Sequence, residues 1–345
     1  MKWSVILGVF SLLFLQESSE SLAGFTVDHT SSNLHDIPAE WIARAKQDLH
    51  IAYNHTSHGS QLITGMNALE EFPYYGSTYS WTDTSTGDRS SLSLDDMGIP
   101  GIDDLSQGDY SVDHNGISIA KWAEDTFNYL NDPSNNHINV IMWSWCDIGG
   151  HDIDRYLSSM QWLIDQFSIG GSHIRAAEHP VQFVYITGHA NGGGEGDSSD
   201  IPNRQIRTYC ASHDCILFDF SDMENYDPDN NYFLDKLLQD DLDYDSNSSG
   251  SVDRNWASEY LLRHPDSELY KLTKGEGTYP GAETCAHSDG PNNDARLNCV
   301  IKGRSIWYLF ARLSGWNPDP PDTDPPDTPH KVTAMPAINY ILLRQ

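Results

Sequence analysis

The chain has 345 residues, enough for one large α/β domain or two small ones, and 38% of them are hydrophobic, so a sizeable core can be buried. Its formal charge is −30, from 50 acidic residues against 20 basic ones. Nucleic acids and anionic membranes bind surfaces rich in lysine and arginine, so the composition argues against both as partners.

The first residues have the pattern of an export signal. A basic start at residues 1–3 is followed by an apolar run over residues 4–15, and small residues follow at Ala23-Gly24. Such a run is too short to span a bilayer, and no later run in the sequence approaches the length that would be needed. We therefore expect a signal peptide over residues 1–23, a secreted protein and no membrane span.

Strands and helices alternate along the rest of the chain. The strands are apolar throughout, which is typical of strands that are buried on both faces. This pattern predicts a three-layer α/β/α domain with a mostly parallel sheet over residues 25–316. Strands are expected at 49–53, 138–145, 181–187 and 215–220, and helices at 38–49, 60–71, 117–130, 152–167, from Pro202 to about 213, and 298–313.

The remaining segments have little periodicity. We expect an extended lead-in at 25–37, long loops with room for one short strand at 73–116, and polar, loop-rich structure at 221–280. Prolines and aspartates predict a stiff linker at 317–329, and the tail at 330–345 is given no role.

Five cysteines follow the export signal, and an exported chain meets an oxidising compartment in which disulfides form. By proximity in the sequence we expect Cys285 to pair with Cys299 and Cys210 to pair with Cys215, which leaves Cys146 odd. The sequence contains no Cys-x-x-Cys motif, so a zinc–thiolate centre is the weaker interpretation.

Polar side chains follow the predicted strands, at the sheet edge where doubly wound proteins bind ligands. Together they include the parts needed for nucleophilic acyl transfer: a serine at a helix start, a histidine to take its proton, a group to orient the histidine, and donors for an oxyanion. The clusters are His55/Ser57/His58, Ser144/Cys146/Asp147, His189/Asn191, Asp219/Asp222, and the segment Glu283–Asp289 ahead of the last helix.

The order of these parts resembles that of the SGNH, or GDSL-like, hydrolases. The likeness is carried by His55-Thr-Ser57-His-Gly59 after the first strand and by Cys285-Ala-His287 before the last helix, and it spans roughly residues 48–316. It is closest to secreted bacterial relatives whose first block reads His-x-Ser-x-Gly. The family's Gly-Asp-Ser and Gly-x-Asn-Asp blocks have no counterpart here, and Thr284 stands three residues before the histidine, where the family usually has Asp.

The resemblance implies a flavodoxin-like central sheet and a serine esterase that acts on carbohydrate esters or other small esters without a cofactor. Ser57 would be the nucleophile and His287 the base. Glu283 and Asp289 are candidates to orient His287, and Gly59, Ser144 and Asn191 are candidates to bind the oxyanion. Five further residues are expected to line the site: His55, His58, His189, Cys146 and Asp147.

Three alternatives stay open. Ser57 could be a helix N-cap rather than a nucleophile. The protein could be a non-catalytic carbohydrate-binding or surface protein that keeps the fold. It could also be a metal-assisted hydrolase that uses His55, His58 and His189, although we assign no metal ligands because no third ligand is evident beside the His-x-x-His pair.

Overall fold

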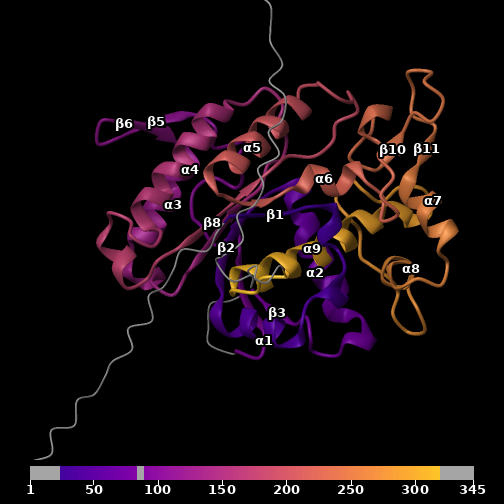
Figure 1. Cartoon of the computed structure of the whole chain (residues 1–345), viewed down its shortest axis with the longest axis horizontal. Coiled ribbons are helices and arrows are strands. Elements are labelled where there is room, and N and C mark those ends of the chain that lie inside the picture. Colours follow the sequence, from indigo (N-terminus) through magenta and orange to yellow (C-terminus); the bar gives the residue numbers. More distant parts are fainter. Residues whose placement is uncertain (1–23, 84–88, 319–345) are drawn as a thin grey trace, which may run out of the picture.

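The computed structural model describes residues 24–83 and 89–318 (Figure 1). The expected signal peptide, all but the first two residues of the expected linker, and the C-terminal tail lie outside the described residues. Within them, no helix is long and apolar enough to cross a membrane.

A parallel sheet of seven strands forms the centre of the described structure. Its strands are β1 (Phe25–Val27), β2 (His50–Asn54), β3 (Trp81–Thr82), β4 (Leu92–Asp96), β7 (Val140–Trp143), β8 (Gln182–Ile186) and β9 (Ile216–Phe218), in the order β1-β9-β8-β7-β2-β4-β3. Every neighbouring pair is parallel. If β2, β4, β7, β8 and β9 are numbered one to five, their order is 2-1-3-4-5, which is that of flavodoxin-like sheets. The strand order reverses between β2 and β7, and this is where such sheets bind ligands.

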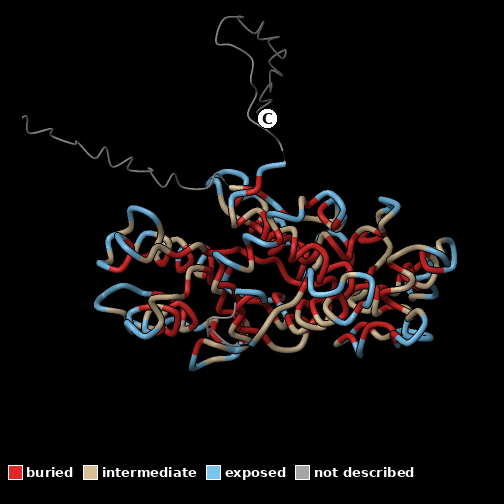
Figure 2. Tube along the Cα trace, turned by 90° about the horizontal axis from the view of Figure 1, so that it is seen from below, coloured by how far each residue is buried: buried red, intermediate tan, exposed pale blue. Residues whose placement is uncertain are grey.

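Helices cover both faces of the sheet, so the three-layer prediction is correct. One layer consists of α1 (Ala39–Asp48), α2 (Ser60–Glu71) and α9 (Leu297–Leu313), and the other of α3 (Lys121–Asn131), α4 (Ile153–Phe167) and α5 (Asp200–His213). Successive strand residues point to opposite faces. Ile51 and Tyr53 accordingly pack with the first layer and Ala52 with the second. Figure 2 shows the buried residues running through the interior, with the exposed ones in the surrounding loops.

Helices α2 and α9 cross in backbone contact at Gly65 and Gly303. A Cβ atom added to Gly65 would lie 2.0 Å from the carbonyl oxygen of Cys299, and one added to Gly303 would lie 2.3 Å from the carbonyl carbon of Gly65. No side chain fits between the helices at this crossing, which aligns the start of α2 with the start of α9.

Several segments differ from their predicted structure. The loop region 73–116 contributes β3 and β4 to the sheet, and the lead-in contributes β1 as an edge strand. The expected helix at 117–130 starts four residues late, because Ile117–Ala120 is strand β6, paired antiparallel with β5 (Ser111–His114). The apolar residues Ile117 and Ile119 suit a strand and a helix equally, and the neighbouring strand decides between them.

The polar region 221–280 is more ordered than its composition indicates. It contains α6 (Phe220–Asn225), α7 (Trp256–Arg263), α8 (Glu268–Lys274) and a small hairpin of β10 (Asp243–Tyr244) and β11 (Arg254–Asn255). Many of its carboxylates accept hydrogen bonds from backbone N–H groups. The Asp245 carboxylate, for example, accepts hydrogen bonds from the N–H groups of Asn247, Ser249 and Gly250.

Candidate active site

Ser57 stands at the carboxyl edge of the sheet, three residues beyond the end of β2. It begins a single turn of 3-10 helix, Ser57–Gly59, that leads directly into α2. Its φ angle is 45°, a left-handed conformation that costs a residue with a Cβ free energy and tends to occur at functional sites. The Ser57 Oγ is in hydrogen-bond contact with Nε2 of His287, which lies 230 residues away in the sequence.

His287 is held in place by its neighbours on both sides. The predicted disulfide between Cys285 and Cys299 is present and ties the loop to the first turn of α9. The Gln61 side chain on α2 donates a hydrogen bond of 2.5 Å to the carbonyl of Ala286. His287 itself has a φ of 61°, so both members of the Ser57–His287 contact have left-handed backbones. The contact therefore depends on α2, α9 and the disulfide together.

Asp240 is the carboxylate beside His287, and sequence reasoning missed it. Its Oδ2 lies 3.7 Å from Nδ1 of His287, which is ion-pair distance, and accepts a 2.8 Å hydrogen bond from Nε2 of His58. Burial would raise the pKa of Asp240, but the hydrogen bond from His58 and the electrostatic interactions with His58, His189 and His287 outweigh it and hold this pKa below its ordinary value. Asp240 is therefore a stable anion opposite the serine side of His287.

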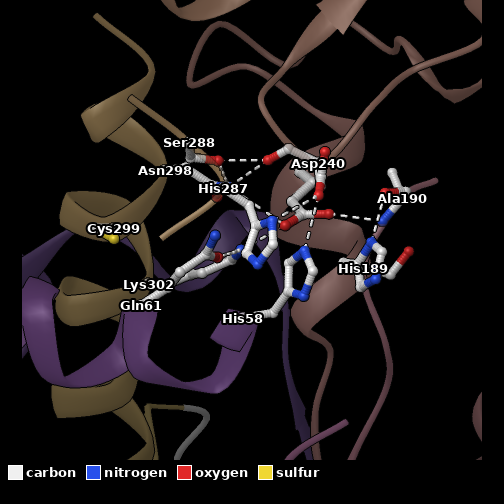
Figure 3. Close-up of polar contacts among 12 residues, drawn as sticks. His58, Gln61, His189, Ala190, Asp240, His287, Ser288, Asn298, Cys299 and Lys302 are labelled. Atoms are coloured by element: carbon white, nitrogen blue, oxygen red, sulfur yellow. Dashed lines mark hydrogen bonds and ion pairs between the residues drawn. The ribbon is translucent and has the colours of Figure 1, made fainter. Parts of the chain in front are cut away.

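Three imidazole rings stack beside this carboxylate (Figure 3). The ring of His58 lies between those of His287 and His189, with centroid distances of 4.1 and 3.7 Å and interplanar angles of 12° and 8°. Burial lowers the pKa of His58, and the hydrogen bond to Asp240 opposes this only in part, so the ring is neutral at pH 7. The His189 Nδ1 is paired with the carbonyl of Ala190 at 2.7 Å.

A fully buried ion pair lies beneath the histidines. Lys302 on α9 and Glu224 on α6 have no exposed side-chain surface, and their Nζ and Oε1 atoms are 2.5 Å apart. The Lys302 ammonium also contacts the Gln61 side chain, and the second Glu224 oxygen accepts the N–H of Ala190 at 2.7 Å. The burial lowers the pKa of Lys302 to about 8. This pair connects the segments that carry Ser57, His189 and His287.

Asn298, on the first turn of α9, connects the same network to Asp240. Its amide donates to the Asp240 carbonyl at 3.3 Å and to the Ser288 hydroxyl at 2.9 Å. That hydroxyl in turn donates to the same Asp240 carbonyl. The backbone of Asp240 is thus fixed from α9 and from the residue next to His287.

The three oxyanion candidates differ in how free their donors are. The Gly59 N–H donates to the Thr56 carbonyl at 2.8 Å and is already used. The Asn191 amide donates to the Ser198 hydroxyl at 3.2 Å. The Ser144 hydroxyl is buried beside the Tyr53 hydroxyl, with which it interacts, and a Cβ on Gly59 would lie 2.0 Å from it. The Gly59 N–H is thus already used, whereas the Asn191 amide keeps a second N–H.

Neither predicted orienting carboxylate pairs with His287 in the described structure. Asp289 accepts hydrogen bonds from Arg296 at 2.8 Å and from the Cys285 N–H at 3.3 Å. Glu283 is exposed. The carboxylate beside His287 is instead that of Asp240, which comes from a different part of the chain.

The other expected lining residues belong to separate contacts. His55 pairs through Nε2 with Asp96 at the end of β4, at 2.7 Å. The N–H groups of Cys146 and Asp147 both donate to the Ser106 hydroxyl at 3.1 Å, in the loop after β7. These contacts close the neighbouring loops of the carboxyl edge.

The predicted Cys210–Cys215 disulfide is wrong for this structure. Both residues carry free thiols, as does Cys146. The two thiols of Cys210 and Cys215 are nevertheless hydrogen-bonded to each other, an interaction that raises the pKa of Cys210 and lowers that of Cys215. Their closeness in sequence predicts proximity correctly, but the turn between α5 and β9 leaves the sulfurs unbonded.

Two groups of described residues have ligand atoms close enough together to hold a metal ion. One is His58, Asp240 and His287, and the other is Asp28, His29 and Asp222; within each group the ligand atoms all lie within 4.8 Å of one another. The sequence-based metal hypothesis grouped His55 and His189 with His58. The structure replaces them with Asp240 and His287.

No local sequence signal marks Asp240, Lys302 or Glu224. Asp240 lies in an acidic loop where carboxylates are frequent, and a lysine with apolar neighbours in a helix is ordinarily assigned to the surface. The one available clue is that the packing side of the last helix contains both Asn298 and Lys302.

Comparison with family models, with curated proteins and with solved structures found no match to this chain.

Proposed function

We propose that the protein is a secreted serine hydrolase that cleaves carbohydrate esters or similar small esters. The observation that carries this proposal is the contact between the Ser57 hydroxyl and Nε2 of His287, made at the carboxyl edge of the sheet by two residues with left-handed backbones. A helix cap would leave the Ser57 side chain directed at backbone N–H groups, and this turn has no side-chain cap hydrogen bond.

The proposed reaction starts when the Ser57 Oγ attacks the ester carbonyl carbon while its proton moves to Nε2 of His287. The resulting imidazolium transfers this proton to the departing alcohol oxygen, and the acyl group stays on Ser57. Water then attacks the acyl carbon while Nε2 takes one of its protons. The acid is released as Nε2 transfers that proton to the departing Ser57 Oγ, which returns the serine to its hydroxyl form and the histidine to its neutral form.

Asp240 is the group that makes His287 a competent base. Its carboxylate faces Nδ1, at 3.7 Å, so a positive charge on the ring would be stabilised where it forms. Such contacts are often long before substrate binds and shorten in the reacting complex. The low pKa of Asp240 keeps the carboxylate ionised when His287 takes the proton.

The Ser144 hydroxyl is our candidate oxyanion donor, because it lies next to the Ser57–Gly59 turn. The class of substrate rests on the resemblance of the His55–Gly59 and Cys285–His287 blocks to the SGNH hydrolases. Secretion rests on the sequence of residues 1–23.

The proposal is tested by reacting the full-length secreted protein with a fluorophosphonate probe and with aryl acetates and acetylated polysaccharides. We expect the probe to label Ser57, and both labelling and hydrolysis to be lost in Ser57→Ala and His287→Ala. Ser158→Ala is the matched control, since this exposed serine lies on α4 in the opposite helical layer. Full hydrolysis by Ser57→Ala would exclude the mechanism.

Absence of both labelling and hydrolysis in the correctly folded parent protein would favour the non-catalytic alternative. In that case binding of acetylated polysaccharides, measured by calorimetry, would be retained by Ser57→Ala.

A further inference from the structure

The same cluster that would orient the base has the composition of a transition-metal site. We propose that His58, Asp240 and His287 bind a Zn²⁺-class divalent cation, and that the bound cation switches the hydrolase off. The regulatory part of this inference rests on the proposed function, whereas the binding part does not.

The ligand atoms already have suitable spacing. In a tetrahedral zinc site with bonds of about 2.1 Å, neighbouring ligand atoms lie roughly 3.4 Å apart. In the structure, Asp240 Oδ2 lies 2.8 Å from Nε2 of His58 and 3.7 Å from Nδ1 of His287, and the three ligand atoms fall within 4.8 Å of one another. The rings of His58 and His287 are stacked with an interplanar angle of 12°, so both would turn until their nitrogens converge on the cation.

The segments that carry the three ligands are held in advance. The ring of His58 lies between those of His287 and His189, and that of His189 is paired with the carbonyl of Ala190. The Asp240 backbone is fixed by Asn298 and Ser288, and the loop of His287 is closed by a disulfide. Ligands that are ordered before binding lose little entropy when the ion arrives.

The chemistry of the donors selects the ion. Two imidazoles and one carboxylate are the ligand types that zinc accepts, whereas Mg²⁺ and Ca²⁺ require mainly oxygen ligands. Coordination through Nε2 of His58 would replace its hydrogen bond to Asp240, and the ring proton would then reside on Nδ1, which has no hydrogen-bond partner in the described structure. The site leaves a fourth position for water.

Coordination would disable His287 as a base through its tautomer. When Nδ1 of a neutral imidazole binds a cation, the ring proton resides on Nε2. The Nε2 of His287 would then donate to the Ser57 Oγ instead of accepting its proton, so the serine could not be activated. The cation would also occupy the Asp240 carboxylate, which then could not stabilise an imidazolium.

Binding is measured first, by titrating ZnCl₂ calorimetrically into the full-length Ser57→Ala protein, which has all three ligands but no nucleophile. We expect one site, and affinity at least tenfold lower in Ser57→Ala combined with either His58→Gln or Asp240→Asn. His29→Gln in the same background is the matched control, because it removes the other candidate cluster, Asp28/His29/Asp222, and leaves this one intact. Equal affinity in the His58 and Asp240 variants would overturn the inference.

Inhibition is measured second, on the parent protein with an aryl acetate. We expect ZnCl₂ to abolish hydrolysis at the concentration that saturates the calorimetric site, a chelator to restore it, and MgCl₂ to have no effect. Full activity with the site saturated would overturn the regulatory part, as would activation by zinc, which would instead favour a metal-assisted hydrolase.

The two proposals fail in different ways. Zinc binding by a protein without any hydrolytic activity would leave the metal site standing and remove the proposed function. Hydrolysis that depends on Ser57 in a protein that does not bind zinc would do the reverse.

Discussion

The two edges of the central sheet bring together different kinds of group. At the carboxyl edge lie Ser57, His287 and Asp240, with left-handed backbones at the first two and a buried ion pair below. At the amino edge, where β8 and β9 begin, a cavity of about 490 Å³ is lined by residues that include Tyr185 and Cys215.

This cavity is thus not where Ser57, His287 and Asp240 meet. The amino-edge cavity does contain His213, but its Nδ1 is paired with the Tyr209 carbonyl at 2.9 Å and its ring stacks on Tyr209. At the carboxyl edge, by contrast, the histidines face a carboxylate and a serine. The candidate site is therefore identified by which segments converge and by how their charges are compensated, rather than by cavity volume.

The strongest test of this difference between the two edges is to remove the charge of Asp240. We expect Asp240→Asn to lower kcat for ester hydrolysis on the order of 10²-fold or more, with a smaller change in KM, because the imidazolium of His287 loses its counter-charge. Steady-state kinetics on an aryl acetate measure this. The matched carboxylate is Asp289, which pairs with Arg296, and Asp289→Asn should lose less than tenfold. Equal losses would show that Asp240 has no special role.

The next largest effect concerns the ion pair below the carboxyl edge. Lys302→Met leaves Glu224 charged, buried and unpaired, and we expect the free energy of unfolding to fall by about 3–5 kcal/mol. The double variant Lys302→Met/Glu224→Leu should recover much of that loss, because it also removes the uncompensated charge. Denaturant unfolding of the single and double variants tests this. A double variant less stable than Lys302→Met would contradict the explanation.

The crossing of α2 and α9 offers a smaller perturbation of the same edge. Gly303→Val forces the two helix backbones apart, and we expect about 1–3 kcal/mol of destabilisation together with a lower kcat, since the Ser57 and His287 segments separate. Ser212→Val, on the exposed side of α5, adds the same branched side chain to a helix away from the crossing. Comparable losses of kcat in both variants would argue against a role for the crossing.

The pH dependence of stability reports on Lys302 itself. Its pKa is lowered from 10.5 to about 8 by burial, although Glu224 and, from further away, Asp240 oppose this. Between these two values the unfolded chain binds more protons than the folded one, so this group makes the free energy of unfolding rise with pH. We expect the free energy of unfolding of the parent to rise relative to that of Lys302→Met between pH 8 and 10. Denaturant unfolding of both proteins across this pH range measures the difference. A parallel pair of curves would show that Lys302 keeps an ordinary pKa.

The smallest effect is expected at the amino edge. Cys215→Ser should leave kcat within about twofold of the parent value, because its side chain lines the cavity at the start of β9 and contacts no residue of the candidate site. Steady-state kinetics on the aryl acetate used for Asp240 decide the point. A loss as large as that of Asp240→Asn would mean that the chemistry takes place at the cavity, and the comparison of the two edges would be reversed.

Much of the framework follows from the sequence. The apolar runs that precede Asn54, Ser144 and Thr187 are long enough to identify three central strands, and the side chains that follow them lie at the carboxyl edge, as parallel strands require. The sequence allows one short strand within 73–116 but does not locate β4, because Leu92–Asp96 ends in charged residues and follows a polar stretch. Its position next to β2 depends on pairing with a strand that is distant in the sequence, which no local pattern reveals.

The candidate site is predictable only in part, for a related reason. Ser57 and His287 each stand at the boundary of a recognisable helix, so their neighbourhoods can be read from the sequence. Asp240 lies in a loop whose course is set by tertiary contacts with Asn298 and Ser288. Many carboxylates occur in this acidic segment, and the packing of the loop decides that Asp240 is the one beside His287. The residues that direct this packing lie around α9 rather than near Asp240 in the sequence.

The backbone contact of Gly65 with Gly303 also bears on when activity can arise during synthesis. Ser57 is translated long before α9, and the segment around it has no partner for its crossing glycine until the C-terminal helix has been made and docked. Contacts between such distant segments form late in folding. Under the proposed function, a ribosome-bound or C-terminally shortened chain would carry the serine without presenting it to its base, and hydrolysis would begin only after α9 has docked.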